Sequence, residues 1–392
     1  MECIGRLWMT LDDRLGILYN PWTMKKLLKK LIEAESTEAA GELAVAKVIR
    51  DELKRPGIDC KVDSWQKNRA NLIASVKSGG RKKGLLFACH LDVVPAGQGW
   101  DSPPFKPVER DGKIFGRGAT DMKGGIAAIV TAIKQIVDSG MKLGGDIILV
   151  GAAGEETDSC GAERYVRNFG KKANLAGIVI PEPTDFDIVT AHRGLLWLQV
   201  STIGKAAHGS APHLGINAIT LTRQFLDELD KYKIPFKPHK LLGGCSMSVN
   251  TIETGKAINI VPDKCTTGID IRTLPRQKHQ EIIGDLQKIF AKLKKKNPQF
   301  QADISIVRDT NALETDVKND FVRQFCSAVE IAETKAVGFT TDGPCFAQLG
   351  VPVIIFGPGK PGACHKANEY IEIKDLEKAV EYYKQVILNF LV

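Results

Sequence analysis

Hydrophobic and polar positions follow two different patterns along this chain of 392 residues. The first half contains short runs rich in Ile, Val and Leu, separated by segments of helical period, and these runs read NLIASV, KGLLFACHLD, GDIILVGAAGEE and AGIVIPEP. Strands that are apolar on both faces and alternate with helices are typical of a parallel sheet covered on both sides. The pattern therefore predicts an α/β fold with a mostly parallel sheet.

The pattern changes near residue 193. The segment GLLWLQVSTIG alternates apolar and polar positions, and the order β-α-β-β-α-β then extends to about residue 307. This order is typical of a ferredoxin-like α+β domain with one exposed sheet face. The pattern of apolar strands and helices resumes with the run PVIIFGPG and a closing helix, DLEKAVEYYKQVILNFLV. We predict a main domain formed by residues 24–192 and 308–392, and an inserted domain formed by residues 193–307.

The first 23 residues show no clear period, whereas an amphipathic helix is predicted from Met24 onward. We interpret residues 1–23 as an N-terminal extension or as the product of a misassigned start codon. The opening MECIGRLWMTLDD lacks the basic-then-apolar layout of a signal peptide, and no run approaches the ~20 apolar residues of a membrane span. The sequence predicts a cytoplasmic protein that does not enter a membrane.

Charge and cysteine content narrow the possible functions. The net charge of +8 raises the question of nucleic-acid binding, but the richest basic runs, RKKG and KLKKKNP, lack interleaved aromatic residues. We interpret them as solvated lysines and expect no nucleic-acid partner, whereas small acidic substrates fit the charge equally well. The nine cysteines are scattered singly, so neither a zinc ribbon nor a disulfide framework is predicted.

Histidines and carboxylates follow several of the apolar runs. The candidate side chains are His90, Asp92, Asp121, Glu155, Glu156, Glu182 and His365. Taken alone, each has an ordinary structural explanation, such as a helix N-cap for Asp121. Because the carboxyl ends of parallel strands meet at one edge of a sheet, however, these side chains are expected to gather there. Clustered carboxylates repel one another, and a bound cation removes that penalty.

Imidazole and carboxylate groups together favour zinc or a related divalent metal such as cobalt or manganese. About five ligands exceed what one zinc ion needs with a position left open, so two ions sharing a bridging carboxylate are predicted. Asp92, two residues after His90, is expected to accept a hydrogen bond that fixes the tautomer of this histidine.

Several motifs occur together in a specific order: CHLDVVPAG, GRGATDMKGG, GEE, PEPT, GKAAHGSAPHLGINAI and IVPDKCTTGIDIR. With these motifs the chain, from about residue 24 to its end, resembles the acetylornithine deacetylase and succinyl-diaminopimelate desuccinylase family, relatives of carboxypeptidase G and aminoacylase. The resemblance implies a pair of zinc ions, with His90 and Glu182 on one ion, Glu156 and His365 on the other, and Asp121 bridging. It also implies a cis peptide bond between Asp121 and Met122.

The resemblance and the spacing together suggest further roles. Glu155 is the candidate general base, and an extended backbone would point it away from its neighbour Glu156. His208, in the inserted domain, is implied to reach the active site of a second subunit and to stabilise an oxyanion there. The inserted domain then serves as a lid or dimerisation domain. Two further residues of the inserted domain, Asn259 and Arg272, are implied to bind a substrate carboxylate, with Arg193 as an additional candidate.

We therefore expect a homodimeric metallo-amidohydrolase that releases an amino acid from an N-acyl amino acid. Deacylation of compounds like N-acetylornithine is the first choice, and a carboxypeptidase or dipeptidase of the same mechanism is the alternative. A non-catalytic amino-acid-binding or scaffold protein is a further alternative, which the presence of Glu155 disfavours, because a binding protein needs no general base.

Overall fold

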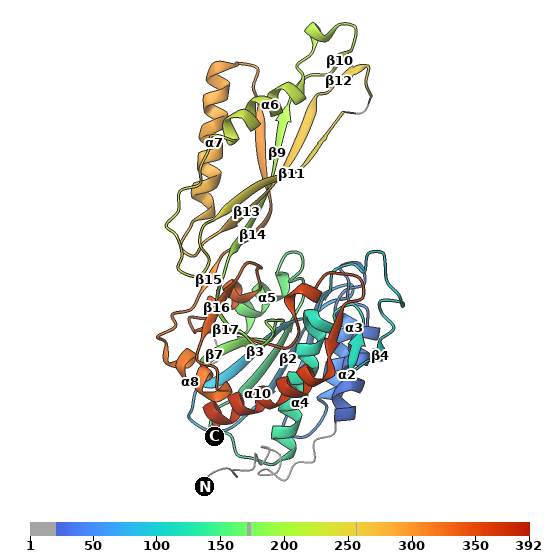
Figure 1. The fold of residues 1–392 in the computed structure, drawn as a ribbon, viewed down its shortest axis with the longest axis vertical. Coiled ribbons are helices and arrows are strands. Elements are labelled where there is room, and N and C mark those ends of the chain that lie inside the picture. Colours follow the sequence, from blue (N-terminus) through green and yellow to red (C-terminus); the bar gives the residue numbers. More distant parts are fainter. Residues whose placement is uncertain (1–20, 171–173, 256) are drawn as a thin grey trace, which may run out of the picture. The chain divides into compact units, whose positions relative to one another are not determined.

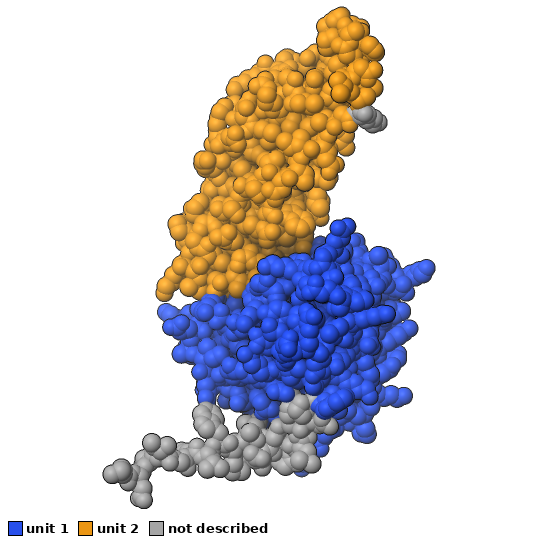
Figure 2. All heavy atoms as spheres, turned by 45° about the vertical axis from the view of Figure 1, so that its right-hand side comes forward, with its two compact units in different colours: residues 1–190, 315–335, 341–392 blue, residues 191–314, 336–340 orange. Residues whose placement is uncertain are grey.

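The structure is a computed structural model that describes residues 21–170, 174–255 and 257–392. Contacts divide the chain into unit 1 (residues 1–190, 315–335 and 341–392) and unit 2 (residues 191–314 and 336–340), which Figure 2 draws in different colours. The expected boundaries were 192/193 and 307/308, and the second falls inside a strand that continues to Thr310. Most of the predicted extension, residues 1–20, lies outside the described residues.

A nine-stranded sheet, most of whose residues belong to unit 1, runs in the order β1-β2-β6-β3-β7-β17-β8-β15, with β16 also paired to β8. These strands are β1 (Asp59–Gln66), β2 (Arg69–Val76), β3 (Gly84–His90), β6 (Ile147–Ala152), β7 (Leu175–Ile180), β8 (Ile188–His192), β15 (Leu313–Glu314), β16 (Thr334–Val337) and β17 (Val353–Ile355). The four central strands β6, β3, β7 and β17 are parallel, and antiparallel strands flank them. The predicted mixed α/β class with a mostly parallel centre is confirmed.

Helices pack on both faces of this sheet because its central strands are apolar throughout: every residue of β3 and β6 is buried. The helices of unit 1 are α2 (Pro21–Glu33), α3 (Leu43–Glu52), α4 (Gly124–Asp138), α5 (Cys160–Asn168), α8 (Asp320–Val329), α9 (Gly343–Ala347) and α10 (Ile373–Leu391). Figure 1 shows α4 and α10 side by side in front of the sheet, and both contact β3. Helix α5 packs on β2 and β6, and α9 packs on β17.

A small three-stranded sheet completes unit 1. It consists of β4 (Val108–Arg110), β5 (Lys113–Phe115) and β18 (Tyr370–Glu372), in the order β18-β5-β4. A short kinked segment, η1 (Ala119–Lys123), with non-helical dihedral angles at Asp121 and Met122, leads from this region into α4. Among the helices of the described residues, none is both long and apolar enough to span a bilayer.

Unit 2 contains an antiparallel sheet with the order β11-β13-β9-β14. Its elements are β9 (Gly194–Ile203), β10 (Ala207–His208), η3 (Pro212–Leu214), α6 (Ala218–Leu229), β11 (Ser246–Thr254), β12 (Ile260–Val261), β13 (Lys264–Thr273), α7 (His279–Lys296) and β14 (Ala302–Thr310). Buried and more exposed positions alternate along β13, because one face of the sheet packs against α6 and α7. The β-α-β-β-α-β order is therefore present, with two-residue strands β10 and β12 added.

Candidate metal centre

Five of the predicted side chains lie together at the carboxyl edge of the central strands. We refer to His90, Asp121, Glu156, Glu182 and His365 as the metal set. His90 Nε2 lies 3.0 Å from Asp121 Oδ1 and 3.7 Å from Glu182 Oε1. His365 Nε2 lies 3.1 Å from Asp121 Oδ2 and 3.0 Å from Glu156 Oε1. Asp121 thus turns one carboxylate oxygen toward each histidine.

The donor atoms of this set fit a divalent cation. One potential ligand atom each from His90, Asp121 and Glu156 lies within 4.8 Å of the other two. Imidazole nitrogens and carboxylate oxygens are the donors that zinc, cobalt and manganese accept. Glu182 Oε1 is too far from His90 for a hydrogen bond, which leaves a buried carboxylate facing the same space.

The pKa shifts in the metal set indicate that positive charge is favourable among its carboxylates. Asp121 and Glu156 accept hydrogen bonds from His365 and raise its pKa to about 10. Burial raises the pKa of Asp121, but the hydrogen bonds from His365 and His90 outweigh burial and lower it overall. Burial raises the pKa of Glu182 well above its usual value. Positive charge close to these carboxylates is favourable, and a bound cation would supply it.

The carboxylate of Asp92 organises the loop after β6. It accepts backbone hydrogen bonds from Gly154, Glu155 and Glu156 at 3.0, 3.1 and 3.0 Å. His90 Nδ1 lies 2.9 Å from the backbone oxygen of Asp92 and 3.7 Å from its carboxylate, so both the main chain and the side chain of Asp92 face this nitrogen. The side chain of Asp92 also holds the loop.

Glu155 is buried beside the metal set. The backbone at residues 155–158 forms a turn rather than the extended conformation that had been considered, because Gly154 has a φ of +80°. The positive φ favours glycine at residue 154, where a Cβ atom would also lie 2.5 Å from the movable side-chain atoms Arg69 Nη2 and Asp158 Oδ1. Burial raises the pKa of Glu155 well above its usual value, and the carboxylates around it add to this effect.

A second carboxylate, which the sequence did not single out, organises the loop that carries Asp121. Glu369 is 1% exposed and accepts backbone hydrogen bonds from Gly118, Thr120 and Asp121 at 3.0, 2.9 and 3.0 Å. Arg117 Nη1 donates to it at 2.7 Å, and this arginine is also buried. The Asp121–Met122 peptide bond is cis, as expected. No local signal reveals this pair, because 252 residues separate its members.

The remaining predicted site residues belong to unit 2. His208, in β10, is exposed, and its Nδ1 lies 2.7 Å from Ser210 Oγ. The backbone oxygen of Asn259 accepts a hydrogen bond from Gly209 at 2.7 Å, so Asn259 is adjacent to the β10 segment. The guanidinium of Arg272 donates twice to Asp270, at 2.8 and 3.0 Å.

Arg193 Nη2 donates to the backbone oxygen of Leu242 at 2.9 Å. Like the ion pair of Arg272 with Asp270, this bond is a structural contact of the arginine within unit 2.

Comparison with known proteins identifies the family. Residues 86–389 match the model described as peptidase family M20/M25/M40. The chain belongs to this family of metallopeptidases and amidohydrolases.

Two curated relatives and one solved structure illustrate the similarity. A probable succinyl-diaminopimelate desuccinylase of Staphylococcus epidermidis is 30% identical, over 93% of this chain and 97% of that protein. An acetylornithine deacetylase of Buchnera aphidicola is 29% identical, over 82% of this chain and 84% of that protein. The structure of an M20 family metallo-carboxypeptidase from Sulfolobus solfataricus superposes with a TM-score of 0.78 at 20% identity, covering 94% of this chain and 98% of that one, which shows a shared fold.

Proposed function

We propose that this protein is a metal-dependent amide hydrolase that releases an amino acid from an N-acyl amino acid, with compounds like N-acetylornithine as the first choice of substrate. The observation that carries the proposal is the arrangement of the metal set around Asp121, with the buried Glu155 beside it. The names of relatives that are about 30% identical over most of the chain support the same reaction class.

We assign two divalent ions to the metal set, with zinc as the first choice and cobalt or manganese as alternatives. His90 and Glu182 would hold one ion, His365 and Glu156 would hold the other, and Asp121 would contribute to both. This assignment follows the pairing of distances, since each imidazole lies beside one Asp121 oxygen and one glutamate. When bound, the ions polarise the substrate carbonyl and make a water molecule acidic.

Glu155 is the general base of the proposal. It takes a proton from the attacking water and delivers it to the nitrogen of the leaving amine, so that the amide C–N bond breaks to give a carboxylic acid and an amine, and transfer of the acid's proton to the amine then yields a carboxylate and an ammonium group. Burial supports this role, because it raises the pKa of the carboxyl group and so makes the carboxylate a stronger base.

Unit 2 supplies the substrate-recognition part of the proposal. Arg272 offers the guanidinium N–H groups that Asp270 does not occupy, and Asn259 and Arg193 are assigned to the same substrate carboxylate. We also propose a homodimer, in which His208 of one subunit stabilises the oxyanion at the metal set of the other. The hydrogen bond with Ser210 supports this role, since it fixes the orientation of the exposed imidazole.

The direct test is hydrolysis of a substrate panel by metal-free protein refilled with zinc, with metal content measured in the same sample. The panel contains N-acetylornithine, N-succinyl-diaminopimelate and a set of dipeptides. We expect hydrolysis of the acylated amino acids with about two ions per chain. Hydrolysis confined to dipeptides would replace the deacylase by the second candidate, a dipeptidase or carboxypeptidase. No hydrolysis with both ions bound would contradict the proposed reaction.

Subunit mixing tests the assignment of His208. We consider a mixed dimer of a Glu155→Gln subunit and a His208→Ala subunit. If the histidine acts across the interface, one of its two sites has both an intact Glu155 and an intact His208. If the histidine acts within its own subunit, neither site has both residues. Activity that returns on mixing two inactive variants therefore supports the proposal. Mixed dimers that remain inactive, with dimerisation verified by light scattering, contradict it.

A further inference from the structure

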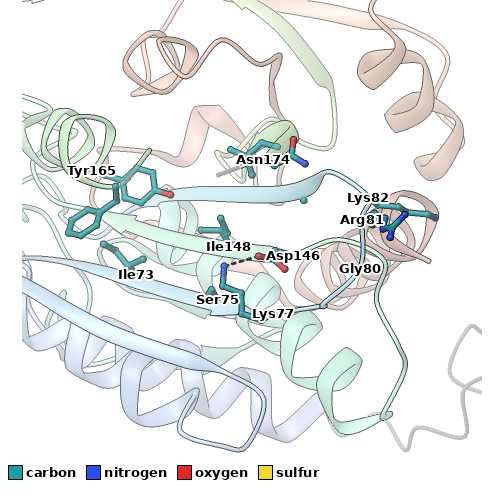
Figure 3. A pocket seen from close by; sticks show the side chains of 13 residues that line it. Ile73, Ser75, Lys77, Gly80, Arg81, Lys82, Asp146, Ile148, Tyr165 and Asn174 are labelled. Atoms are coloured by element: carbon teal, nitrogen blue, oxygen red, sulfur yellow. Dashed lines mark hydrogen bonds and ion pairs between the residues drawn. The ribbon is translucent and has the colours of Figure 1, made fainter. Parts of the chain in front are cut away.

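A cavity of about 490 Å³ lies at the amino edge of the central sheet, where β3, β6 and β7 begin. This edge is opposite to the one that carries the metal set. Figure 3 shows the side chains that line the cavity. Its floor is largely apolar and includes Ile73 of β2, Ile148 of β6 and Leu175 of β7. Its volume falls within the range of ~300–1,000 Å³ that is typical of small-molecule sites. We call it the amino-edge cavity.

The length of helix α5 explains why this part of the sheet is uncovered. The helix begins at the carboxyl edge, where Gly161 donates to the backbone oxygen of Ala153 just after β6. It has nine residues and therefore rises only about 13 Å, whereas the eight residues of β2 extend over about 26 Å. The helix ends before the amino edge, and the sheet face beyond it becomes the floor of the cavity.

A tyrosine from the second half of α5 lines this cavity. Tyr165 is 2% exposed, and its ring packs against Phe169 and Phe346. Within residues 21–170, 174–255 and 257–392, its hydroxyl forms no hydrogen bond, and it is not among the fully buried polar atoms, so a molecule in the cavity can reach it. Figure 3 shows this hydroxyl directed toward the space between the other lining side chains. Burial raises the pKa of Tyr165 to about 12, so the group is a hydrogen-bond donor at neutral pH.

The rim of the cavity is positively charged. Lys77, Arg81 and Lys82 lie there together with one carboxylate, Asp146, so the rim carries two net positive charges. Asp146 accepts a hydrogen bond from Lys77 at 2.7 Å. Lys82 donates to the oxygen of Val392 at 2.9 Å. Arg81 is exposed and forms no ion pair with the described part of the chain.

We propose that the amino-edge cavity binds a small organic anion with an apolar body. The apolar body contacts the floor formed by Ile73, Ile148 and Leu175, and it brings a polar atom to the hydroxyl of Tyr165. The anionic group, a carboxylate, phosphate or sulfonate, lies at the rim between Arg81 and Lys82, where a guanidinium can donate two parallel hydrogen bonds. This site is separate from the metal set, and the proposal does not depend on the hydrolytic reaction.

Titration calorimetry of the full chain with naphthalene-2-sulfonate tests the proposal, because this probe combines a flat apolar body with one anionic group. Naphthalene-2-methanol, which lacks the charge, and methanesulfonate, which lacks the apolar body, are the matched control probes. We expect saturable binding of naphthalene-2-sulfonate with one site per chain and binding at least about tenfold weaker for both controls. Equal affinity for the neutral probe, or no binding of the sulfonate, would overturn the proposal.

Variants locate the bound probe. Ser75→Trp fills the floor of the cavity and is expected to abolish binding, Arg81→Ala to weaken it about tenfold, and Tyr165→Phe to weaken it severalfold. Arg223→Ala, which removes an exposed arginine on α6 of unit 2, is the matched control and should leave the affinity unchanged. Arg81 is exposed, so its variant remains informative even if Ser75→Trp fails to fold. Unchanged affinity in Arg81→Ala and Tyr165→Phe would place the probe elsewhere and contradict the proposal.

Discussion

The two edges of the central sheet in unit 1 carry charges of opposite sign. The charges at the carboxyl edge are buried, whereas those at the amino edge are exposed. At the carboxyl edge, carboxylates gather inside the protein, and two of them, Asp92 and Glu369, are saturated with backbone N–H groups. At the amino edge, lysines and an arginine surround an open cavity, and their charges face solvent. We therefore expect the removal of a charge to affect activity, metal affinity and stability far more at the carboxyl edge than at the amino edge. The reason is that buried charges are poorly screened and exposed ones are well screened.

The largest effect is expected from Glu155→Gln. The amide cannot accept a proton from water, so kcat should fall by about 10²- to 10⁴-fold. The metal content should remain that of the wild type, because Glu155 is not assigned as a ligand. Glu163→Gln, which changes an exposed glutamate on α5, is the matched control for kcat and metal content. Full turnover in Glu155→Gln would exclude the general-base role and favour a binding or scaffold protein.

Glu369→Gln tests the loop that carries Asp121. The change leaves the guanidinium of Arg117 buried without its counter-charge, so the free energy of unfolding should fall by ~3–5 kcal/mol. Urea denaturation measures this loss, and Glu38→Gln, at an exposed position, should leave the midpoint unchanged. A loss below ~1 kcal/mol for Glu369→Gln would show that the buried pair contributes no more than a surface ion pair.

Asp92→Asn tests the other loop of the carboxyl edge. An asparagine amide would turn N–H groups toward the backbone donors of residues 154–156, and the loop that presents Glu156 should lose its fixed position. Metal affinity, measured by competition with a chelator, should fall by about 10- to 100-fold. Asp59→Asn, at an exposed position in β1, serves as the control. Affinity equal to the wild type would mean that the backbone alone maintains the loop.

The smallest effect is expected at the amino edge from Asp146→Asn. Burial raises the pKa of Asp146, but the hydrogen bonds from Lys77 and Ser78 outweigh it and lower the pKa overall. The contribution of this carboxylate to stability is therefore present above the unfolded pKa of about 3.8 and is lost as the pH falls through the folded value. We expect a loss of at most ~1 kcal/mol at pH 7 and none in strong acid. Urea denaturation at both pH values provides the measurement, and a loss that grows in acid would reverse the predicted sign.

The sequence alone predicted the α/β class, the inserted β-α-β-β-α-β order and the residues that meet around Asp121. These predictions succeed because they depend on local periodicity and on the meeting of parallel strands at one edge. The antiparallel direction of β2 could not be predicted, since an apolar run has the same pattern in either direction. The roles of Glu369 and of the Asp92 side chain depend on hydrogen bonds between distant segments, which no local pattern records.

The amino-edge cavity was likewise absent from the sequence analysis. It exists because α5 is shorter than the strands on which it packs, and the apolar positions of Ile73 and Ile148 resemble those of any buried strand. The sequence analysis interprets the basic run RKKG as solvated lysines. Its position beside an apolar floor depends on the folded structure, which the local sequence does not indicate.

The last and first residues of unit 1 on either side of the insertion are joined by a hydrogen bond, in which Thr315 N donates to Thr190 O at 2.8 Å. Next to it, Leu313 pairs with His192 and Glu314 with Ala191 in an antiparallel ladder. The two points at which the chain leaves and re-enters unit 1 are thus neighbours, close enough for a two-residue turn to join them. The larger segment of unit 2, residues 191–314, is therefore a single insertion between two neighbouring points of unit 1, and the shorter segment, residues 336–340, joins unit 2 separately.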